Sequence, residues 1–276
     1  MSYRRALCRE RPQMAPPMFI PVFDSAWILI QPSGVYTSQP ESTMSEFDRW
    51  QGRFAVPEYI FGEEPNVFLA SQKDRLPNSG KVLAVADGEG RNGVFLAEQG
   101  LDTLSIDFSP YAQAKAQALA KKRGVILRTE LADVHNYNWS SEEYDVIAEI
   151  FTQFSTPEER KGKFAGIRKA LKKGGLLLLE GYTPKQLQYG TGGPKQIEHL
   201  YTMDLLEKEF GDFSKVLIKE YDTYMSEGSS HVGMAAVIDL VAPNELFIYP
   251  TEPFTFLQHP SPFCPHAELL FLRPRR

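Results

Sequence analysis

Residues 81–100 read KVLAVADGEGRNGVFLAEQG, and this stretch decides the fold. Its first part, Lys81–Ala86, is a short apolar run of the kind found in parallel strands that are buried on both faces. A glycine-rich turn follows at once, and Asn92–Gln99 then has the apolar content of a helix that Gly100 ends as its C-terminal cap. A strand joined to a helix through such a turn predicts the first unit of a doubly wound α/β sheet.

The segments that follow repeat this alternation. Further strands are predicted at Leu101–Ile106, Val125–Thr129, Tyr144–Ile150 and Leu176–Glu180, and helices at Tyr111–Arg123 and Pro157–Lys173. Such spacing implies right-handed crossovers and a parallel sheet covered on both faces. Beyond these, a helix at Thr202–Phe210 precedes two longer strand-like runs, Lys215–Met225 and Val232–Val241. The predicted fold is a Rossmann-like, doubly wound α/β sheet, mostly parallel, with an antiparallel C-terminal hairpin at its edge.

Proline marks the ends of this domain. Six of the 20 prolines precede it and seven follow it, where they disfavour regular structure. We predict a proline-rich, mobile extension at residues 1–43, the α/β domain at 44–242, and a proline- and aromatic-rich extension at 243–276. The N-terminal arginines leave a targeting peptide open, although an acidic residue and prolines interrupt any signal-like core. Whether the C-terminal extension packs on the domain is also left open.

The composition argues against several classes of protein. The formal net charge of −5 gives no basic excess for a nucleic-acid surface. No apolar run approaches the roughly 20 residues that a membrane span needs. The two cysteines, Cys8 and Cys264, lie near opposite ends and suggest neither a disulfide scaffold nor a metal cluster. We expect a cytoplasmic protein with no metal site and no nucleic-acid or membrane partner, and the oligomeric state is left open.

The glycine-rich turn admits two interpretations. Residues 88–93 spell the G-x-G-x-x-G of a dinucleotide site, and Asp107 stands about 20 residues downstream, as such a site requires. A pyrophosphate favours backbone amides without an adjacent anion, whereas Asp87 and Glu89 lie in this turn. S-adenosylmethionine (SAM) carries an ammonium and a sulfonium, which acidic residues attract. Asp107 suits either ligand, because both present a ribose diol. The charge of the turn therefore favours SAM.

Residues after the next strands extend the predicted cofactor site. Asp133 is placed to accept a hydrogen bond from the adenine amine, and Ala132 offers a backbone amide to the ring. Glu149 and Ile150 end the fourth strand near the switch point, where ligands of open α/β sheets bind. A turn role for Asp133 and a solvated strand-end role for Glu149 are the alternatives. The complete predicted set is Asp87, Gly88, Glu89, Gly90, Asn92, Asp107, Phe108, Ala132, Asp133, Glu149 and Ile150.

These motifs together resemble the class I SAM-dependent methyltransferases over residues 44–242, in particular the branch with the tellurite-resistance and thiol methyltransferases. The matching stretches are VLAVADGEGRNGVFLAEQG, LSIDFSPYA, LAD, YDVIAEIF and LKKGGLLLLEGYTP. The resemblance implies a seven-stranded sheet whose last strand is antiparallel. It also implies an N-terminal substrate cover, for which the candidate residues are Trp50, Arg53, Phe54, Tyr59 and Phe61. The two proline-rich extensions have no counterpart in the family pattern.

Few residues are required for the chemistry. Methyl transfer is an in-line displacement that depends on alignment, and a general base is needed only where the acceptor arrives protonated. The first candidate is His231, in a Glu-x-x-x-His pattern that resembles related bacterial methyltransferases. Tyr182 follows the fifth strand, and Tyr189 begins a glycine-containing loop with the composition of a lid. A solvated histidine and an ordinary loop are the alternatives. Arg53 is a candidate for the SAM carboxylate or an anionic substrate.

The sequence thus predicts an enzyme, a SAM-dependent methyltransferase that methylates a small nucleophile and releases S-adenosylhomocysteine. A thiol, a chalcogen oxyanion or another metabolite would serve as the acceptor. The aromatic cover and the lack of a basic stripe favour a small acceptor over RNA or DNA. Two alternatives remain: an NAD(P)-dependent oxidoreductase that uses the literal G-x-G-x-x-G, and a non-catalytic SAM-binding scaffold or sensor.

Overall fold

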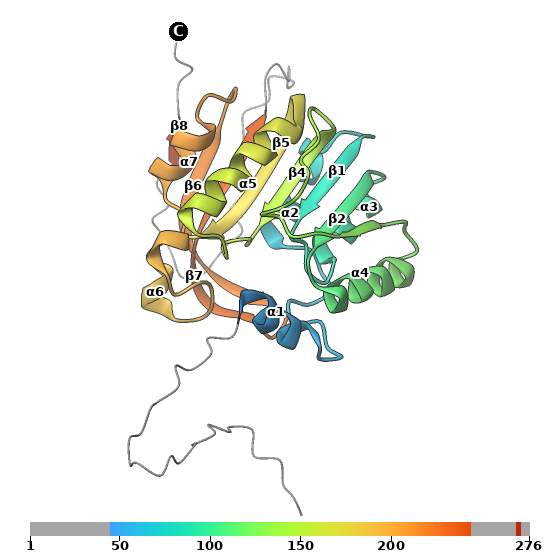
Figure 1. Ribbon diagram of the computed structural model, residues 1–276. Coiled ribbons are helices and arrows are strands. Elements are labelled where there is room, and N and C mark those ends of the chain that lie inside the picture. The colour runs from blue at the N-terminus through green and yellow to red at the C-terminus, as the bar shows by residue number, and fades with distance from the viewer. Residues whose placement is uncertain (1–44, 244–268, 272–276) are drawn as a thin grey trace, which may run out of the picture. The chain divides into compact units, whose positions relative to one another are not determined.

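The computed structural model describes residues 45–243 and 269–271, and every structural statement below concerns these residues (Figure 1). The extension predicted at 1–43 lies outside them, as does most of the extension predicted at 243–276. Within the described part, no helix is both long and apolar enough to cross a bilayer.

An eight-stranded sheet lies at the centre of the domain, in the order β3-β2-β1-β4-β5-β7-β6-β8. The strands are β1 (Lys81–Val85), β2 (Asp102–Asp107), β3 (Arg128–Leu131), β4 (Tyr144–Ile150), β5 (Leu171–Tyr182), β6 (Leu217–Glu227), β7 (His231–Pro243) and β8 (Leu269–Phe271). Strands β1 to β5 pair in parallel, whereas β7 is antiparallel to both β5 and β6. The predicted seven-stranded, mostly parallel sheet is confirmed. The three-residue β8 adds an antiparallel edge strand beside β6, too short to have a sequence pattern of its own.

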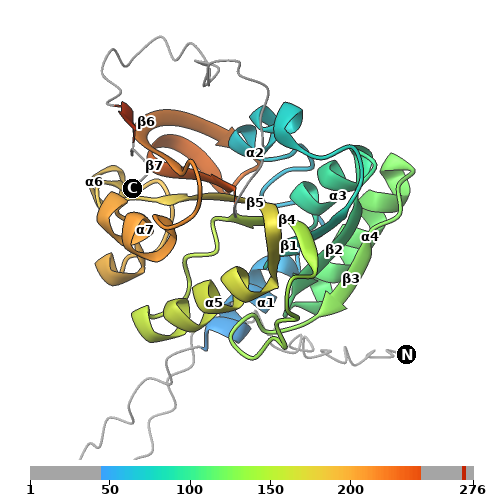
Figure 2. The ribbon, with the colours of Figure 1, turned by 90° about the horizontal axis from the view of Figure 1, so that it is seen from above.

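Helices cover both faces of the sheet (Figure 2). On one face lie α2 (Val67–Ser71), α3 (Arg91–Glu98) and α4 (Pro110–Arg123), and on the other lie α5 (Pro157–Ala170) and α7 (Met203–Phe210). Adjacent residues of β1 serve opposite faces, since Val82 packs with Phe68 and Leu96 while Leu83 packs with Phe164. This two-sided burial is the reason that the central strands are continuously apolar.

Two strands begin three or more residues from the predicted position, each for a local reason. The third strand begins at Arg128 rather than Val125, because Val125 still belongs to the end of α4. Gly124 caps that helix in the left-handed conformation, and the Val125 N–H donates to the Ala120 carbonyl at 3.0 Å. The fifth strand begins early, at Leu171, whose extended backbone ends α5 before the predicted position.

The strand order reverses between β1 and β4, and this reversal positions the site. The connections after these two neighbouring strands lead to opposite faces of the sheet, which opens a crevice at their carboxyl ends. Helix α1 (Glu46–Phe54), helix α6 (Gln186–Tyr189) and the 3₁₀ turn Ile197–His199 lie near this end of the sheet (Figure 1).

Candidate active site

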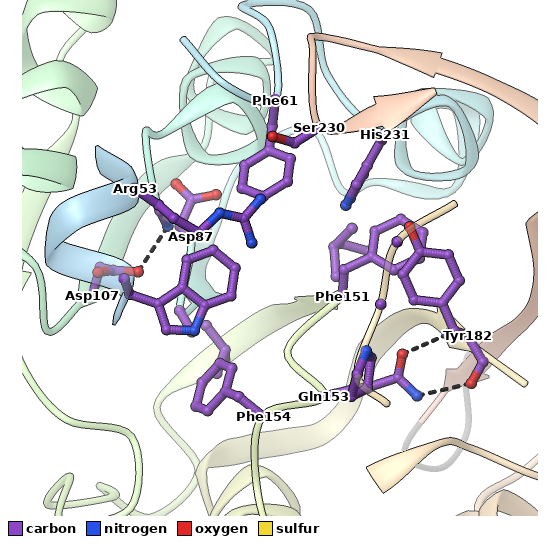
Figure 3. Close-up of a pocket in the computed structure, with 18 of the residues that line it drawn as sticks. Arg53, Phe61, Asp87, Asp107, Phe151, Gln153, Phe154, Tyr182, Ser230 and His231 are labelled. Atoms are coloured by element: carbon purple, nitrogen blue, oxygen red, sulfur yellow. Dashed lines mark hydrogen bonds between the residues drawn. The ribbon is translucent and has the colours of Figure 1, made fainter. Parts of the chain in front are cut away.

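A cavity of about 430 Å³ lies at the carboxyl ends of the central strands (Figure 3). Its walls come from the turn after β1, the ends of β2 and β4, helix α1, the loop at 192–196 and the start of β7. The predicted cofactor-binding residues that line it are Asp87, Gly88, Asn92, Asp107, Phe108 and Ile150. The cavity therefore brings together residues that are far apart in the chain but follow neighbouring strands.

Close packing explains the glycines of the turn after β1. Gly90 has φ +85°, and a Cβ built there would lie 2.4 Å from the Cβ of Ala116 on α4. A Cβ on Gly93 would lie 2.4 Å from Asp87 Oδ2. Gly90 therefore contributes to the site by allowing the turn to lie against α4, and its own atoms are not among the cavity-lining ones.

The two aspartates that line the cavity are held by backbone amides. Asp107 accepts hydrogen bonds from the N–H groups of Gly88 at 2.9 Å and Ser109 at 2.8 Å. Asp87 accepts from the Gly93 N–H at 3.1 Å and from the Ser105 hydroxyl at 2.8 Å. Burial raises the pKa of Asp87 to about 7 and that of Asp107 to about 6, although these hydrogen bonds act in the opposite direction. Both carboxyls are thus fixed, weakly solvated groups at the cavity wall.

Glu89 does not face the cavity. Its side chain is buried, forms an ion pair with Lys115 at 2.6 Å, and accepts a hydrogen bond from the Phe61 N–H at 3.3 Å. The structure thus separates the two acids of the turn: Asp87 faces the cavity, and Glu89 ties α4 to the segment after α1. At the ends of β1 and β2, the acidic residues that line the cavity are Asp87 and Asp107.

The two residues expected at the adenine ring are also placed differently. The Ala132 N–H donates to the Asp107 carbonyl at 3.0 Å, so this amide is already used. The Asp133 carboxylate accepts from the His135 N–H and from the Asn136 side chain, each at 3.0 Å. Neither residue lines the cavity. In this structure the Asp133 carboxylate thus forms its hydrogen bonds within its own turn.

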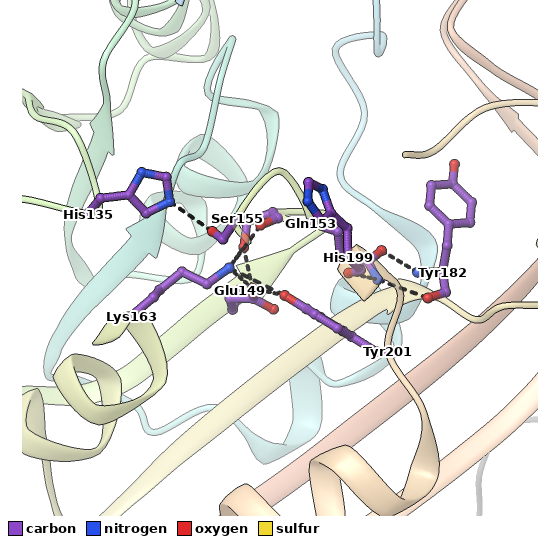
Figure 4. A network of polar contacts seen from close by, with 9 residues as sticks. His135, Glu149, Gln153, Ser155, Lys163, Tyr182, His199 and Tyr201 are labelled. Carbon is purple, nitrogen blue, oxygen red and sulfur yellow. Dashed lines mark hydrogen bonds and ion pairs between the residues drawn. The ribbon is translucent and has the colours of Figure 1, made fainter. Parts of the chain in front are cut away.

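Glu149 is the centre of a buried polar network behind the cavity (Figure 4). Its Oε1 forms an ion pair with Lys163 at 2.7 Å and accepts from the Tyr201 hydroxyl at 2.7 Å and from the Thr152 hydroxyl. Both partners of the ion pair are fully buried, and burial lowers the pKa of Lys163. Glu149 therefore does not reach the cavity, and Ile150 is the residue of this pair that lines it.

The N-terminal segment around α1 forms an aromatic wall of the cavity. Trp50, Arg53, Phe54 and Phe61 line the cavity, whereas Tyr59 turns away and donates to the Lys115 carbonyl at 2.9 Å. The Arg53 guanidinium lies 4.5 Å from the Trp50 ring and 5.4 Å from the Phe61 ring. Burial, and then the neighbouring Arg49, lower the pKa of Arg53. Within residues 45–243, Arg53 forms no ion pair.

Of the three catalytic candidates, two line the cavity and one does not. His231 points into it, with its ring 4.5 Å from that of Phe61 and 4.9 Å from that of Phe151 (Figure 3). Tyr182 also lines the wall, and burial raises its pKa well above the ordinary value, so it stays protonated. Tyr189 lies outside the lining, although the glycines of its loop, Gly192 and Gly193, are part of the wall.

Sequence reasoning missed several residues at the end of β4. Phe151, Gln153 and Phe154 line the cavity, and Phe151 has φ +55°, which is uncommon for a bulky residue. Strained backbone of this kind is often found at functional sites. The only available signal was position, because all three residues directly follow a strand whose end was expected at the site.

Comparison with known proteins agrees with this geometry. Residues 82–175 match the family model described as a methyltransferase domain. The glycine/sarcosine N-methyltransferase of Parasynechococcus marenigrum (strain WH8102) is 32% identical over 119 residues, which is 42% of each chain. The enzyme of the same name from Halorhodospira halochloris is 32% identical over 124 residues, 42% of this chain and 44% of that one. The match thus spans less than half the length of these curated relatives.

Solved structures share the fold at lower identity. TehB from Haemophilus influenzae has a TM-score of 0.53 at 15% identity, covering 72% of this chain and 67% of its own. A putative methyltransferase from Bacillus halodurans has a TM-score of 0.51 at 13% identity, covering 66% of this chain and 100% of its own. The matched family model, the curated relatives and the strand order all lead to one assignment. Residues 82–175 therefore have the methyltransferase domain that the family model describes, on the fold that these solved structures share.

Proposed function

We propose that this protein is a SAM-dependent methyltransferase whose acceptor is a small nucleophile. The observation that carries the proposal is the Asp107 carboxylate, which lines the cavity while two backbone N–H groups hold it in place. A carboxylate fixed in this way can accept the hydrogen bonds of a ribose diol without reorganising. SAM bound here supplies an electrophilic methyl group, and its cationic charge suits the nearby Asp87.

The amides of the turn favour SAM over a dinucleotide. A pyrophosphate needs free backbone N–H groups at the helix N-terminus. Here the Gly88 N–H donates to Asp107, and the Gly93 N–H donates to the Asp87 carboxylate. The Gly90 N–H donates to the Asp87 carbonyl at 3.2 Å. With all three glycine amides engaged in this way, the turn favours SAM over a dinucleotide.

The opposite wall suits a small acceptor that arrives protonated. Burial lowers the pKa of His231, and Arg91 and Arg53 lower it further against the effect of Glu227, so its imidazole is neutral at pH 7. A neutral ring directed into the cavity can accept the proton of a nucleophile. The unpaired charge of Arg53 suits an acceptor that carries an anion. The curated relatives are described as glycine/sarcosine N-methyltransferases, so a small amine with a carboxylate joins the thiols and chalcogen oxyanions as a candidate acceptor.

The first test is calorimetric titration of the full-length chain with SAM, S-adenosylhomocysteine and NADH. We expect the two adenosyl compounds to bind and NADH not to bind. Asp107→Ala should weaken adenosyl binding at least about tenfold, because it removes hydrogen bonds to a charged group. Asp102→Ala is the matched control, since Asp102 is half exposed at the other end of the same strand. Binding of NADH alone, or of none of the three, would contradict the proposal.

The second test separates an enzyme from a non-catalytic binding protein. Methyl transfer from labelled SAM should be measured to glycine and sarcosine, to small thiols and to chalcogen oxyanions. The enzyme proposal expects turnover on at least one acceptor and loss of that turnover in Asp107→Ala. Adenosyl binding without turnover on any acceptor would favour the scaffold or sensor alternative.

A further inference from the structure

The carboxylate of Glu227, at the end of β6, lies between the turn after β1 and His231. Its Oε2 forms an ion pair with Arg91 at 2.7 Å and lies 3.7 Å from His231 Nδ1. Its Oε1 accepts a hydrogen bond from the Val67 N–H at 3.2 Å. The side chains of Arg91, Glu227 and His231 are only 7%, 8% and 9% exposed. Because a buried ion pair often adds little net stability, a structural role alone is a weak explanation for this one.

Arg91 connects this carboxylate to the cofactor turn. It directly follows Gly90, and its guanidinium also donates to the Phe61 carbonyl at 3.1 Å. The neighbouring Ile60 carbonyl accepts two backbone N–H groups from the hairpin turn that precedes His231, at 3.0 and 2.9 Å. The cofactor turn, the aromatic cover and the hairpin therefore meet at one buried ion pair.

We propose that Glu227 is a positioning residue that holds the His231 ring with Nδ1 toward its carboxylate and Nε2 toward the cavity, and that Arg91 makes this arrangement depend on the cofactor turn. The inference rests on the proposed function, in which His231 accepts a proton. Because Nδ1 faces an anion, it carries the proton of the neutral ring and leaves the lone pair on Nε2. The rings of Phe61 and Phe151, which flank His231, restrict its rotation.

The charged groups around His231 oppose one another. Burial lowers its pKa, Glu227 raises it, and Arg91 and Arg53 lower it. Tyr182, the other titratable group in contact, lies 5.9 Å away between ring centroids and is protonated at neutral pH. If the Glu227 carboxylate and the Arg91 guanidinium both act on this ring, removing the carboxylate should lower the His231 pKa. Removing the guanidinium should raise it.

The experiment is an NMR titration of the full-length protein labelled with ¹⁵N-histidine. The chain has five histidines, and His231→Asn assigns the relevant signals. We expect Glu227→Gln to lower the His231 pKa by about one unit and Arg91→Gln to raise it by about as much. The ¹⁵N shifts should show the Nδ1-protonated tautomer in the wild type and a mixture in Glu227→Gln. Glu220→Gln, on the exposed side of the same strand, is the control and should change neither.

Two results would overturn the proposal: an unchanged His231 pKa in both variants, or shifts of the same sign. If Glu227→Gln does not fold, Arg91→Gln and the double variant carry the test, because the double variant leaves neither charge unpaired. The double variant should have a His231 pKa between those of the single variants. The titration needs no methyl acceptor and no bound SAM, so its outcome is independent of the calorimetric test of the proposed function.

Discussion

The side-chain amide of Gln153 bonds both backbone polar groups of Tyr182. Its Nε2 donates to the Tyr182 carbonyl at 2.8 Å, and its Oε1 accepts from the Tyr182 N–H at 2.5 Å. These residues follow β4 and end β5, so one side chain joins the carboxyl ends of two neighbouring strands at the cavity wall. Dashed lines mark both bonds in Figure 3.

Replacing this amide should destabilise the domain measurably. Gln153→Ala leaves the buried N–H of Tyr182 without its partner, which costs about 1–3 kcal/mol. The Tyr182 carbonyl keeps the backbone N–H of Tyr201 at 2.9 Å. Urea denaturation followed by circular dichroism gives the free energy of unfolding. Gln188→Ala, at an exposed position of α6, is the control and should have almost no effect. A Gln153→Ala variant as stable as the wild type would show that the two hydrogen bonds to Tyr182 do not stabilise the fold.

The raised pKa values of Asp87 and Asp107 predict opposite effects of pH on stability and on binding. A carboxyl whose pKa is higher in the folded chain than in the unfolded chain stabilises the fold only while it is protonated. Its contribution is complete below about pH 4 and is lost as the pH rises through about 6 to 7. SAM, by contrast, is attracted to the ionised forms, so its affinity should rise over that window.

Calorimetry and thermal unfolding between pH 5 and pH 8 test both directions, with Asp107→Asn as the comparison. The variant should lose much of the pH dependence of SAM affinity. An affinity for SAM that falls with rising pH would contradict the role of these acids.

The glycine of the cofactor turn and a glycine of α5 should respond to alanine in opposite ways. Gly90→Ala is strained by its positive φ and by contact with the backbone and side chain of Ala116, so we expect a loss of stability and of SAM affinity. Gly162 lies in the exposed interior of α5 with no atom near its missing Cβ. Gly162→Ala should stabilise the protein by about 0.5–1 kcal/mol, because glycine is a poor helix former. Thermal unfolding of both variants measures the two changes in stability. A Gly90→Ala variant more stable than the wild type would contradict the packing argument.

The strands and the crevice could be predicted because they depend on local patterns. Apolar runs bounded by glycine and proline identify the strands, and the turn at Asp87–Gly93 identifies the crevice. The direction in which an acidic side chain points is a different matter. Glu89 and Glu149 both lie where a ligand-facing acid was expected, yet each is turned into the protein by a lysine far along the chain, Lys115 and Lys163. The hydrophobic periodicity of the sequence does not predict which lysine pairs with a given glutamate.

Backbone conformation limited the prediction in the same way. Ala132 was expected to present its amide to a ligand, but that amide pairs with the carbonyl of Asp107 where β3 ends beside β2. The aromatic cover was easier to identify, because Trp50 and Phe61 lie in a segment with a recognisable family pattern. Their contacts with Arg53 needed the folded chain.

The buried ion pair between Lys163 and Glu149 should tolerate the loss of both partners better than the loss of one. Lys163→Met leaves a fully buried carboxylate without its cation, which costs about 3–5 kcal/mol. The double variant Lys163→Met/Glu149→Gln leaves no unpaired charge and should recover most of that loss. Urea denaturation of the wild type, Lys163→Met, Glu149→Gln and the double variant measures the coupling. Equal destabilisation in the single lysine variant and in the double variant would contradict a charge-based explanation.

Arg53 should be needed for ligands that carry a carboxylate and unnecessary for those that do not. Its guanidinium lies between two aromatic rings, without an ion pair in the described chain, so an incoming anion is its natural partner. We expect Arg53→Gln to weaken S-adenosylhomocysteine at least about tenfold if the cofactor supplies that anion, and to leave 5′-methylthioadenosine unaffected. If an acceptor supplies it, the variant should instead raise KM for anionic acceptors alone. Arg49→Gln is the control, because Glu46 already pairs with that side chain at 2.6 Å. If Arg53→Gln binds every carboxylate-bearing ligand as tightly as the wild type does, Arg53 has no role in binding these ligands.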